Sequence, residues 1–144
     1  MVRVAQEKDI NILANLAALL YNTISVLELE KEFYQAILKD NVKFFLKYDN
    51  NLPVGFAEIS LRYDYVEGSE TSPVGYLEGI YVKEAFRGKG YARELLKECE
   101  NWAKSKGCSE FASDCELSNE NSYNFHKAVN FKETNRIICF IKKL

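Results

Sequence analysis

The chain has 144 residues, a formal net charge of −2 and an apolar fraction of 47% that includes nine Phe and nine Tyr. This length suits one domain, residues 1–144, and the apolar content predicts a packed core rather than disorder. The charge excludes nucleic-acid binding through overall basicity. No apolar run reaches the roughly 20 residues that span a bilayer. The first ten residues contain no secretory signal, so a cytoplasmic protein without membrane partners is expected.

The cysteines give little support to a metal site. The four of them form no C-x-x-C pair, and the chain contains a single His. We interpret them as reduced, mostly buried thiols and expect no bound metal.

The first part of the chain predicts one short strand and two helices. Residues 2–5 alternate as a strand. Leucine and isoleucine repeat at helical spacing over 10–21, and Asp9 stands in position to cap that helix. A second helix is expected over 28–39.

Three strands should follow. Residues 42–49 and 54–65 are rich in aromatic and branched side chains, and the polar turn between them predicts an antiparallel hairpin. After a second polar turn, residues 74–82 predict a third strand.

The remainder alternates between helix and strand. A helix begins near Gly90 and should stop at Gly107, with its apolar side chains on one face. Residues 109–115 predict a strand, 119–129 a helix and 136–143 a last strand. The strands on either side of the Gly90 helix should be parallel. The fold class is therefore mixed α+β: a central, mostly antiparallel sheet with helices on both faces and one parallel βαβ unit.

A glycine-rich turn connects the third strand to the helix that begins near Gly90. Its sequence is Arg87-Gly88-Lys89-Gly90-Tyr91-Ala92. A helix N-terminus offers unpaired N–H groups, glycines let a ligand approach the backbone, and the two cations suit phosphate. The alternative is a tight connection with solvated basic residues. The spacing is neither a Walker loop nor a dinucleotide fingerprint.

This turn resembles the acetyl-CoA-binding motif of the GCN5-related N-acetyltransferase (GNAT) superfamily. The motif R-x-x-G-x-A is matched by Arg87, Gly90 and Ala92, and the order of elements is similar along the whole chain. The stretch NSYNFHKAVNF resembles the terminal helix signature of the superfamily. The resemblance implies acetyl-CoA as co-substrate, with its pyrophosphate on the amides of residues 88–92. Its pantetheine would lie in a gap between two strands, bonded to the backbone of Ile80, Tyr81 and Val82.

Further stretches resemble aminoglycoside 6′-N-acetyltransferases in particular. These are RYDYVEGSETSPV within residues 61–82 and FASDCELSN at 111–119, together with His126 where most of the superfamily has Tyr. The resemblance implies transfer of an acetyl group to the 6′-amine of an aminoglycoside, a small polycation. It also suggests a homodimer.

Acidic and aromatic side chains accompany these stretches. A cleft lined by carboxylates would attract a polycation, and tyrosine rings such as that of Tyr65 would pack against sugars. The alternative is that these acids are ordinary solvated loop residues. Glu78 and Asp114 are the strongest candidates, because each is predicted to lie in an otherwise apolar strand. The acids concerned are Asp64, Glu67, Glu70, Glu78, Asp114, Glu116 and Glu120.

The chemistry requires a neutral amine, a polarised carbonyl and a protonated leaving group. Glu78 or Asp114 would remove the proton from the ammonium or anchor it, and the sequence does not separate these roles. A backbone N–H near Tyr81 or Val82 would polarise the thioester. By its matching position, His126 would protonate the thiolate, with Tyr123 as the alternative.

Asn119 and Cys115 lie in the same region. Asn119 matches an Asn of the resembled enzymes and is expected to contact pantetheine or substrate. Cys115 is not expected to form an acyl-enzyme, because no Cys, His and Asp set stands in clear order.

One departure leaves the substrate open. The resembled enzymes often carry Leu-Trp-Pro near the acceptor site, where this chain has Leu20-Tyr21-Asn22. Glu28, Glu30 and Glu32 of the next helix would supply charge there or face solvent. Acetylation of a polyamine or a protein amine, and a CoA-binding module without catalysis, remain alternatives.

Overall fold

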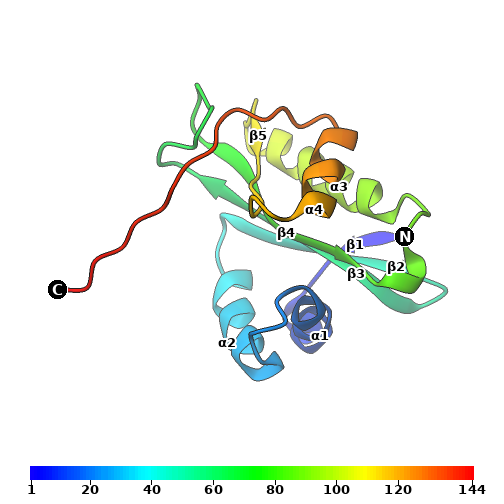
Figure 1. Ribbon diagram of the computed structural model, residues 1–144. Helices are drawn as coiled ribbons and strands as arrows, with labels where there is room; N and C mark the ends of the chain where they lie inside the picture. Colours follow the sequence, from blue (N-terminus) through cyan, green and yellow to red (C-terminus); the bar gives the residue numbers. More distant parts are fainter.

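The structure, a computed structural model, describes residues 1–144. It contains one five-stranded sheet in the order β1-β2-β3-β4-β5, with helices on both faces (Figure 1). The strands are β1 (Val2–Val4), β2 (Val42–Asp49), β3 (Leu52–Arg62), β4 (Val74–Val82) and β5 (Phe111–Ala112). The helices are α1 (Ile10–Leu20), α2 (Val26–Ile37), α3 (Tyr91–Ser105) and α4 (Glu120–Ala128), with 3₁₀ turns η1 (Glu7–Asp9) and η2 (Glu84–Phe86). None of the helices combines the length and apolar character needed to cross a membrane.

Strand pairing confirms the predicted mixed sheet. Neighbouring strands from β1 to β4 are antiparallel, and only β4 and β5 are parallel. The predicted hairpin is β2 and β3, joined by a tight turn in which Asn50 and Asn51 have φ of 47° and 67°. Asn tolerates this left-handed backbone better than most residues, because its short side chain can bond locally.

The core consists of two layers, one on each face of the sheet. Side chains alternate along β2, so Phe44 and Leu46 pack against α1 and α2 while Phe45 packs on the α3 side. Figure 1 shows α1 and α2 on one face and α3 and α4 on the other. Both faces of the central strands are therefore dry, which accounts for the nearly continuous burial of β2 and β3.

Helix α3 buries the face that its sequence predicts. Leu95, Leu96, Cys99 and Ala103 are buried in the core, and Gly107 follows the helix with φ of +85°. Gly107 adopts the left-handed conformation at which helices commonly end. These buried side chains hold α3 against the sheet, with its N-terminus beside the end of β4.

Helix α1 begins at Ile10, as predicted, but without the predicted side-chain cap, and α2 begins earlier than predicted. The Asp9 side chain does not cap α1; its carboxylate instead accepts hydrogen bonds from Arg3 at 2.8 Å and from the Gln6 backbone N–H at 2.9 Å. The ion pair with Arg3 therefore outcompetes the cap. Helix α2 starts at Val26, where the Ser25 hydroxyl accepts a hydrogen bond from the Glu28 N–H.

Strand β5 is shorter than predicted. Only Phe111 and Ala112 pair with β4, so Asp114 and Cys115 lie beyond the strand and are exposed. The prediction that Asp114 sits within an apolar strand is therefore wrong. After these two residues the chain diverges from β4 and leaves the sheet.

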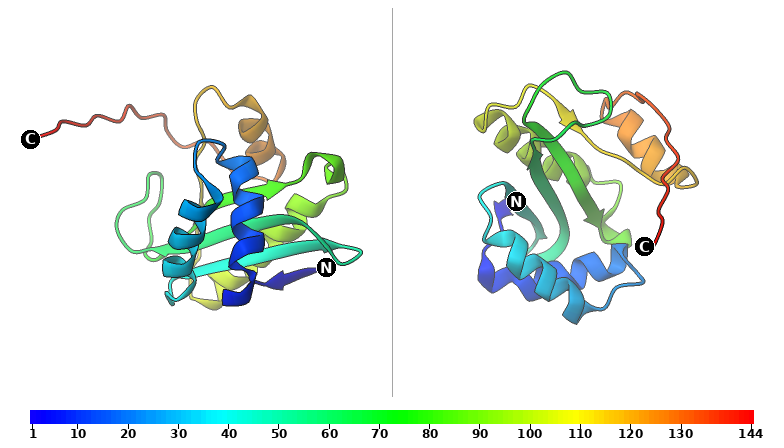
Figure 2. Two further views of the ribbon diagram at one scale, coloured as in Figure 1. Left: turned by 90° about the horizontal axis from the view of Figure 1, so that it is seen from below. Right: turned by 90° about the vertical axis from the view of Figure 1, so that its left-hand side faces the viewer.

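The predicted last strand is absent. Residues 132–144 make no backbone–backbone hydrogen bond, and the C-terminal part of this segment extends away from the domain in Figures 1 and 2. A strand needs a partner for its N–H and C=O groups, and this segment has none within its own chain. Four apolar side chains of this segment are 67–96% exposed: Ile137, Ile138, Phe140 and Ile141.

All four cysteines are free. Cys99 and Cys108 are buried, whereas Cys115 and Cys139 are exposed, so the expectation of mostly buried thiols holds for only half of them. No group of three or more metal-ligating side chains is assembled.

Candidate active site

A gap opens between β4 and β5, along the edge of β4 that faces β5. The last paired residues are Tyr76 and Ala112, and from Leu77 onward β4 has no neighbour on this side. The backbone of residues 77–82 thus keeps an open edge toward the gap. Ile80, Tyr81 and Val82 lie on this edge, as predicted, directly before the loop that leads to α3.

The loop presents a row of free amides. The N–H groups of residues 88–93 donate no backbone hydrogen bond, and the first helical bond is donated by Glu94 to the carbonyl of Gly90. Gly88 and Gly90 have φ of +78° and +82°, and a Cβ on either would meet nothing within 4 Å. Free amides at a helix N-terminus, bounded by open space, are suited to bind an anion such as a diphosphate.

The side chains of the loop are held by their neighbours. The Arg87 Nε donates to the carbonyl of Val82 at 2.9 Å, which ties the loop to the end of β4. The Tyr91 hydroxyl donates to Asp49 at 2.7 Å, and Lys89 pairs with the same carboxylate at 3.4 Å. The Tyr91 hydroxyl bond lowers the pKa of Asp49. Ala92 packs against the core beneath the loop.

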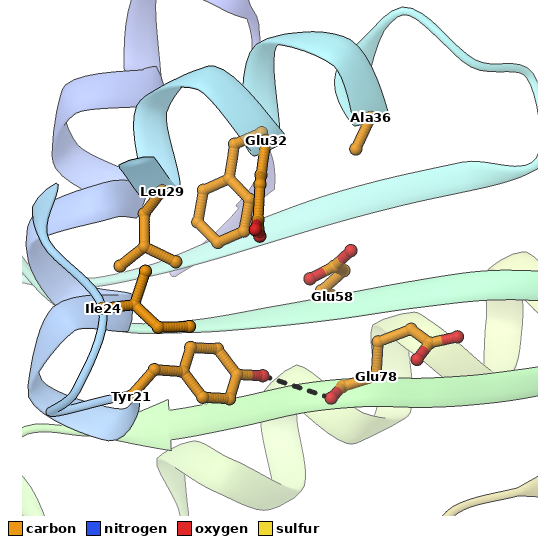
Figure 3. Close-up of a pocket in the computed structure, with 8 residues that line it drawn as sticks. Tyr21, Ile24, Leu29, Glu32, Ala36, Glu58 and Glu78 are labelled. Atoms are coloured by element: carbon orange, nitrogen blue, oxygen red, sulfur yellow. Dashed lines mark hydrogen bonds between the residues drawn. The ribbon is translucent and has the colours of Figure 1, made fainter. Parts of the chain in front are cut away.

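On the opposite face of the sheet, α2 and the connection that precedes it cover an acidic cleft of about 270 Å³ over β3 and β4. Figure 3 shows the carboxylates of Glu32 and Glu58 facing the same space, with the Tyr21 ring beside them. The Tyr21 hydroxyl donates to the carbonyl of Glu78 at 3.3 Å. The residues lining this cleft are Tyr21, Ile24, Leu29, Glu32, Phe33, Ala36, Glu58 and Glu78.

Glu58 is the most perturbed acid of the cleft. Burial, and then the charges of Glu78 and Glu32, raise the pKa of Glu58 to about 7, and no hydrogen bond to its carboxylate offsets this. Burial also raises the pKa of Tyr21 to about 12, with the nearby carboxylates adding to the effect. The cleft therefore carries excess negative potential that a cationic ligand would relieve.

A chain of contacts links the two carboxylates that the sequence singled out. Glu78 accepts hydrogen bonds from Ser60 at 2.6 Å and from Arg62 at 2.9 Å. The Arg62 guanidinium lies 3.4 Å from the centroid of the Tyr76 ring, and the Tyr76 hydroxyl donates to Asp114. Burial and this hydrogen bond raise the pKa of Tyr76. Both acids are thus held in place rather than free.

Helix α4 brings His126 to the gap. The His126 Nε2 lies 2.7 Å from Ser113 Oγ, and its Nδ1 lies 2.6 Å from the carbonyl of Ser122. Tyr123, the alternative acid, instead donates to Glu133 at 3.1 Å. The Asn119 side chain caps α4 by accepting a hydrogen bond from the Ser122 N–H.

The remaining predicted side chains lie on loops. Tyr65 is 76% exposed in the connection between β3 and β4, and Glu116 is exposed in the connection between β5 and α4. Neither side chain makes a hydrogen bond or lines the acidic cleft. The structure thus brings Glu78 and Asp114 together and leaves Tyr65 and Glu116 at the periphery.

Sequence reasoning missed Glu58, Arg62 and Ser113. A signal for Glu58 was present, because it is a carboxylate within an apolar strand, the same feature that singled out Glu78. Arg62 gave a similar signal, as a charged residue in the same predicted strand, 54–65, whereas Ser113 gave none. Their roles depend on which residues the sheet places opposite them.

Residues 12–131 match the family model described as the Acetyltransferase (GNAT) family. The chain belongs to this family.

Several individual proteins of known description are similar to this chain. An aminoglycoside N(6′)-acetyltransferase type 1 of Acinetobacter haemolyticus is 41% identical over 114 residues, 79% of each chain. An enzyme of the same description from Serratia marcescens is 50% identical over 91 residues, 63% of this chain and 62% of the relative. Among solved structures, AAC(6′)-Iy in complex with the bisubstrate analogue CoA-S-monomethyl-acetylneamine superposes with a TM-score of 0.95. It is 31% identical and covers 100% of this chain and 98% of its own.

Proposed function

We propose that this protein transfers the acetyl group of acetyl-CoA to the 6′-amino group of aminoglycosides, by direct attack in a ternary complex. The observation that carries the proposal is the pairing of an open-amide loop and strand gap on one side of β4 with carboxylates on the other. The relatives named above, which are described as aminoglycoside 6′-N-acetyltransferases, support the same activity.

The donor would be held by backbone groups. The amides of residues 88–92 would bind the pyrophosphate of CoA, with Lys89 adding charge. The open edge formed by Ile80, Tyr81 and Val82 would bond to pantetheine in the gap. Asn119, which starts α4 on the far side of the gap, would contribute to the wall of the same channel.

The acceptor would be held by carboxylates. An aminoglycoside carries several ammonium groups, and a cleft of one sign of charge steers such a polycation inward. Glu32 and Glu58 would join Glu78 and Asp114 in this role, while Tyr65 and Glu116 would meet the outer part of the ligand. Because the Glu58 carboxylate has no partner of its own, an ammonium group would supply one.

The transfer needs three proton movements: the nitrogen loses one proton before the attack and one after it, and the leaving thiolate gains one, so each turnover releases one proton. Glu78 or Asp114, directly or through a water, would take a proton from the ammonium, and the neutral nitrogen would attack the thioester carbonyl. A backbone N–H near Tyr81 or Val82 would stabilise the developing oxyanion. The C–S bond then breaks, and the thiolate of CoA takes a proton from the side of the gap where His126 lies. Proximity of the bound reactants makes an acyl-enzyme unnecessary.

We also infer that the protein acts in the cytoplasm as a homodimer. Four free cysteines, two of them exposed, suit a reducing compartment. The exposed apolar residues of the segment 137–141 need a partner, and a second copy of the chain would supply one.

The test is release of CoA thiol by the purified protein with acetyl-CoA and different amines. Turnover is expected with kanamycin-type aminoglycosides that have a free 6′-amine, and none when that amine is replaced by hydroxyl. Spermidine and a short peptide serve as competing acceptors. Turnover with spermidine or the peptide alone would overturn the aminoglycoside assignment, and saturable acetyl-CoA binding without any turnover would leave a CoA-binding module.

A further inference from the structure

Ser113 occupies the point where β4 and β5 separate. It directly follows Ala112, the last residue of β5 paired with β4. Its Oγ lies 3.5 Å from the carbonyl oxygen of Leu77, the first residue of β4 beyond the pairing. The hydroxyl therefore stands at the closed end of the gap, where the two strands separate.

His126 is fixed behind this hydroxyl. Its Nδ1 faces the carbonyl of Ser122 at 2.6 Å, and a carbonyl only accepts, so Nδ1 carries a proton. Nε2 is then the nitrogen that gains or loses a proton, and it lies 2.7 Å from Ser113 Oγ. The ring packs against Phe131 and Phe125, with centroids 5.1 and 5.8 Å away, and these contacts restrict its rotation.

The charge of His126 decides where the Ser113 hydrogen points. Beside neutral His126, the hydroxyl donates to Nε2 and its hydrogen is turned away from the gap. Beside the imidazolium, Nε2–H donates to Oγ, and the hydroxyl hydrogen is released toward Leu77 and the gap. A proton can then pass from His126 to the gap through Ser113.

We propose that Ser113 is the catalytic residue that protonates the leaving thiolate of CoA, with His126 as the positioning residue that resupplies its proton. As the C–S bond breaks, the thiolate sulfur takes the hydroxyl proton of Ser113. Ser113 Oγ in turn takes the Nε2 proton, leaving neutral His126 with its proton on Nδ1. The nitrogen loses two protons as the ammonium becomes an amide: one restores the proton of His126 through solvent, and the other is released, so each turnover releases one proton. The proposal rests on acetyl transfer as proposed above.

The contacts of the neighbouring residues favour this route over direct donation. His126 Nε2 is already occupied by Ser113, so the ring cannot reach past the hydroxyl without breaking that bond. The Tyr123 hydroxyl is turned to Glu133 on the exposed surface. Ser113 alone combines a transferable proton with a position between the separating strands.

The first test compares steady-state kinetics of substituted enzymes. Ser113→Ala is expected to lower kcat by roughly 10²-fold, the lower range for loss of a general acid, with the KM for acetyl-CoA unchanged. Ser113→Thr keeps the hydroxyl and should retain most activity, and Ser118→Ala, in the exposed part of the same connection, should match wild type. His126→Gln still donates to Ser113 but carries no ionisable proton, so its kcat should fall similarly. If Ser113→Ala fails to fold, the kcat of His126→Gln tests the proposal instead.

The second test needs no acceptor. The thiolate absorbance of bound CoA is measured at mildly alkaline pH, with desulfo-CoA as the blank that cancels the protein's own cysteines. A hydroxyl that donates to sulfur favours the thiolate, so wild type should show a larger bound thiolate fraction than Ser113→Ala. Equal fractions, or Ser113→Ala within about threefold of wild-type kcat, would overturn the proposal. If no amine is acetylated, the proposed function fails while the thiolate comparison still decides the role of Ser113.

Discussion

At the scale of single residues, the site is defined by which carboxylates already have partners. Glu78 is satisfied by Ser60 and Arg62, and Asp114 by Tyr76. Glu58 has neither a cation nor a donor, and its pKa is raised to about 7. Glu58 is therefore the carboxylate whose energy a bound ammonium group changes most.

Glu58 should make stability depend on pH in a predictable direction. Its folded pKa lies above the usual 4.5, so the folded chain binds more protons than the unfolded chain between about pH 4.5 and 7, and stability falls as pH rises through that window. Glu58→Gln should therefore raise the melting temperature above pH 7, with the gain disappearing below about pH 4.5. Thermal unfolding across this range measures it.

A matched control and a kinetic readout complete this prediction. Glu28→Gln, on the exposed side of α2, should give no such gain. Glu58→Gln should also raise the KM for the aminoglycoside, because it removes a charge from the cleft. A melting-temperature difference that is the same at all pH values would contradict the burial of Glu58 as the cause.

The limits of prediction at this scale follow from pairing across the sheet. Glu78 was recognised because a charge in an apolar strand is costly, and Glu58 meets the same criterion. Sequence alone cannot show that Arg62 reaches Glu78 or that Ser113 faces His126. Those contacts depend on the register of β3 against β4 and on where β5 leaves the sheet.

At the scale of elements, the junction of β4 and α3 was the most predictable part of the chain. Glycines with positive φ and an amphipathic run define it locally, and no distant partner is needed. Strand β5 was predicted too long, because an apolar pattern does not reveal where a neighbouring strand diverges. The open gap, and with it the proposed donor site, depends on that early divergence.

Gly90→Ala should separate backbone strain from ligand binding. A left-handed conformation costs a non-glycine residue roughly 1–2 kcal/mol, and nothing blocks the added Cβ. Gly107, at the other end of the same helix, has φ of +85°, compared with +82° for Gly90, and the space around it is equally open. Gly107→Ala should therefore lose similar stability. Only Gly90→Ala should weaken acetyl-CoA binding, by at least about tenfold, a factor that corresponds to 1.4 kcal/mol.

Denaturant unfolding and calorimetric titration with acetyl-CoA measure the two effects. Equal losses of affinity in both variants would mean that the loop acts only through helix stability, and would remove the amides of residues 88–92 from the proposed donor site.

At the scale of the whole molecule, the predicted last strand has no place within its own chain. Residues 136–143 have the composition of a strand, yet the segment projects from the domain (Figure 2). Its pattern of apolar side chains was recognised, but a pattern cannot specify whether the partner strand belongs to the same chain. A second copy of the chain reconciles the strand-like sequence with the extended structure.

Truncation of this segment should therefore convert the protein from dimer to monomer. The last side-chain contacts of the segment are the hydrogen bond from Asn135 to Glu67, at 2.6 Å, and those of Arg136 with Glu133. Removal of residues 137–144 leaves these contacts in place and deletes only the unpartnered apolar part. Light scattering on a sizing column should give twice the chain mass for the full chain and one chain mass for the truncated one.

A substituted full-length chain serves as the control for length. Replacing Ile138 and Phe140 by Ser keeps the segment but removes apolar area, and should weaken the dimer without changing acetyl-CoA affinity. Because the core contains none of residues 132–144, the melting temperature of the truncated monomer should stay independent of protein concentration, whereas that of the full chain should rise with it. A full-length chain that is monomeric at every concentration would refute the homodimer, and the exposed segment would then need a different partner.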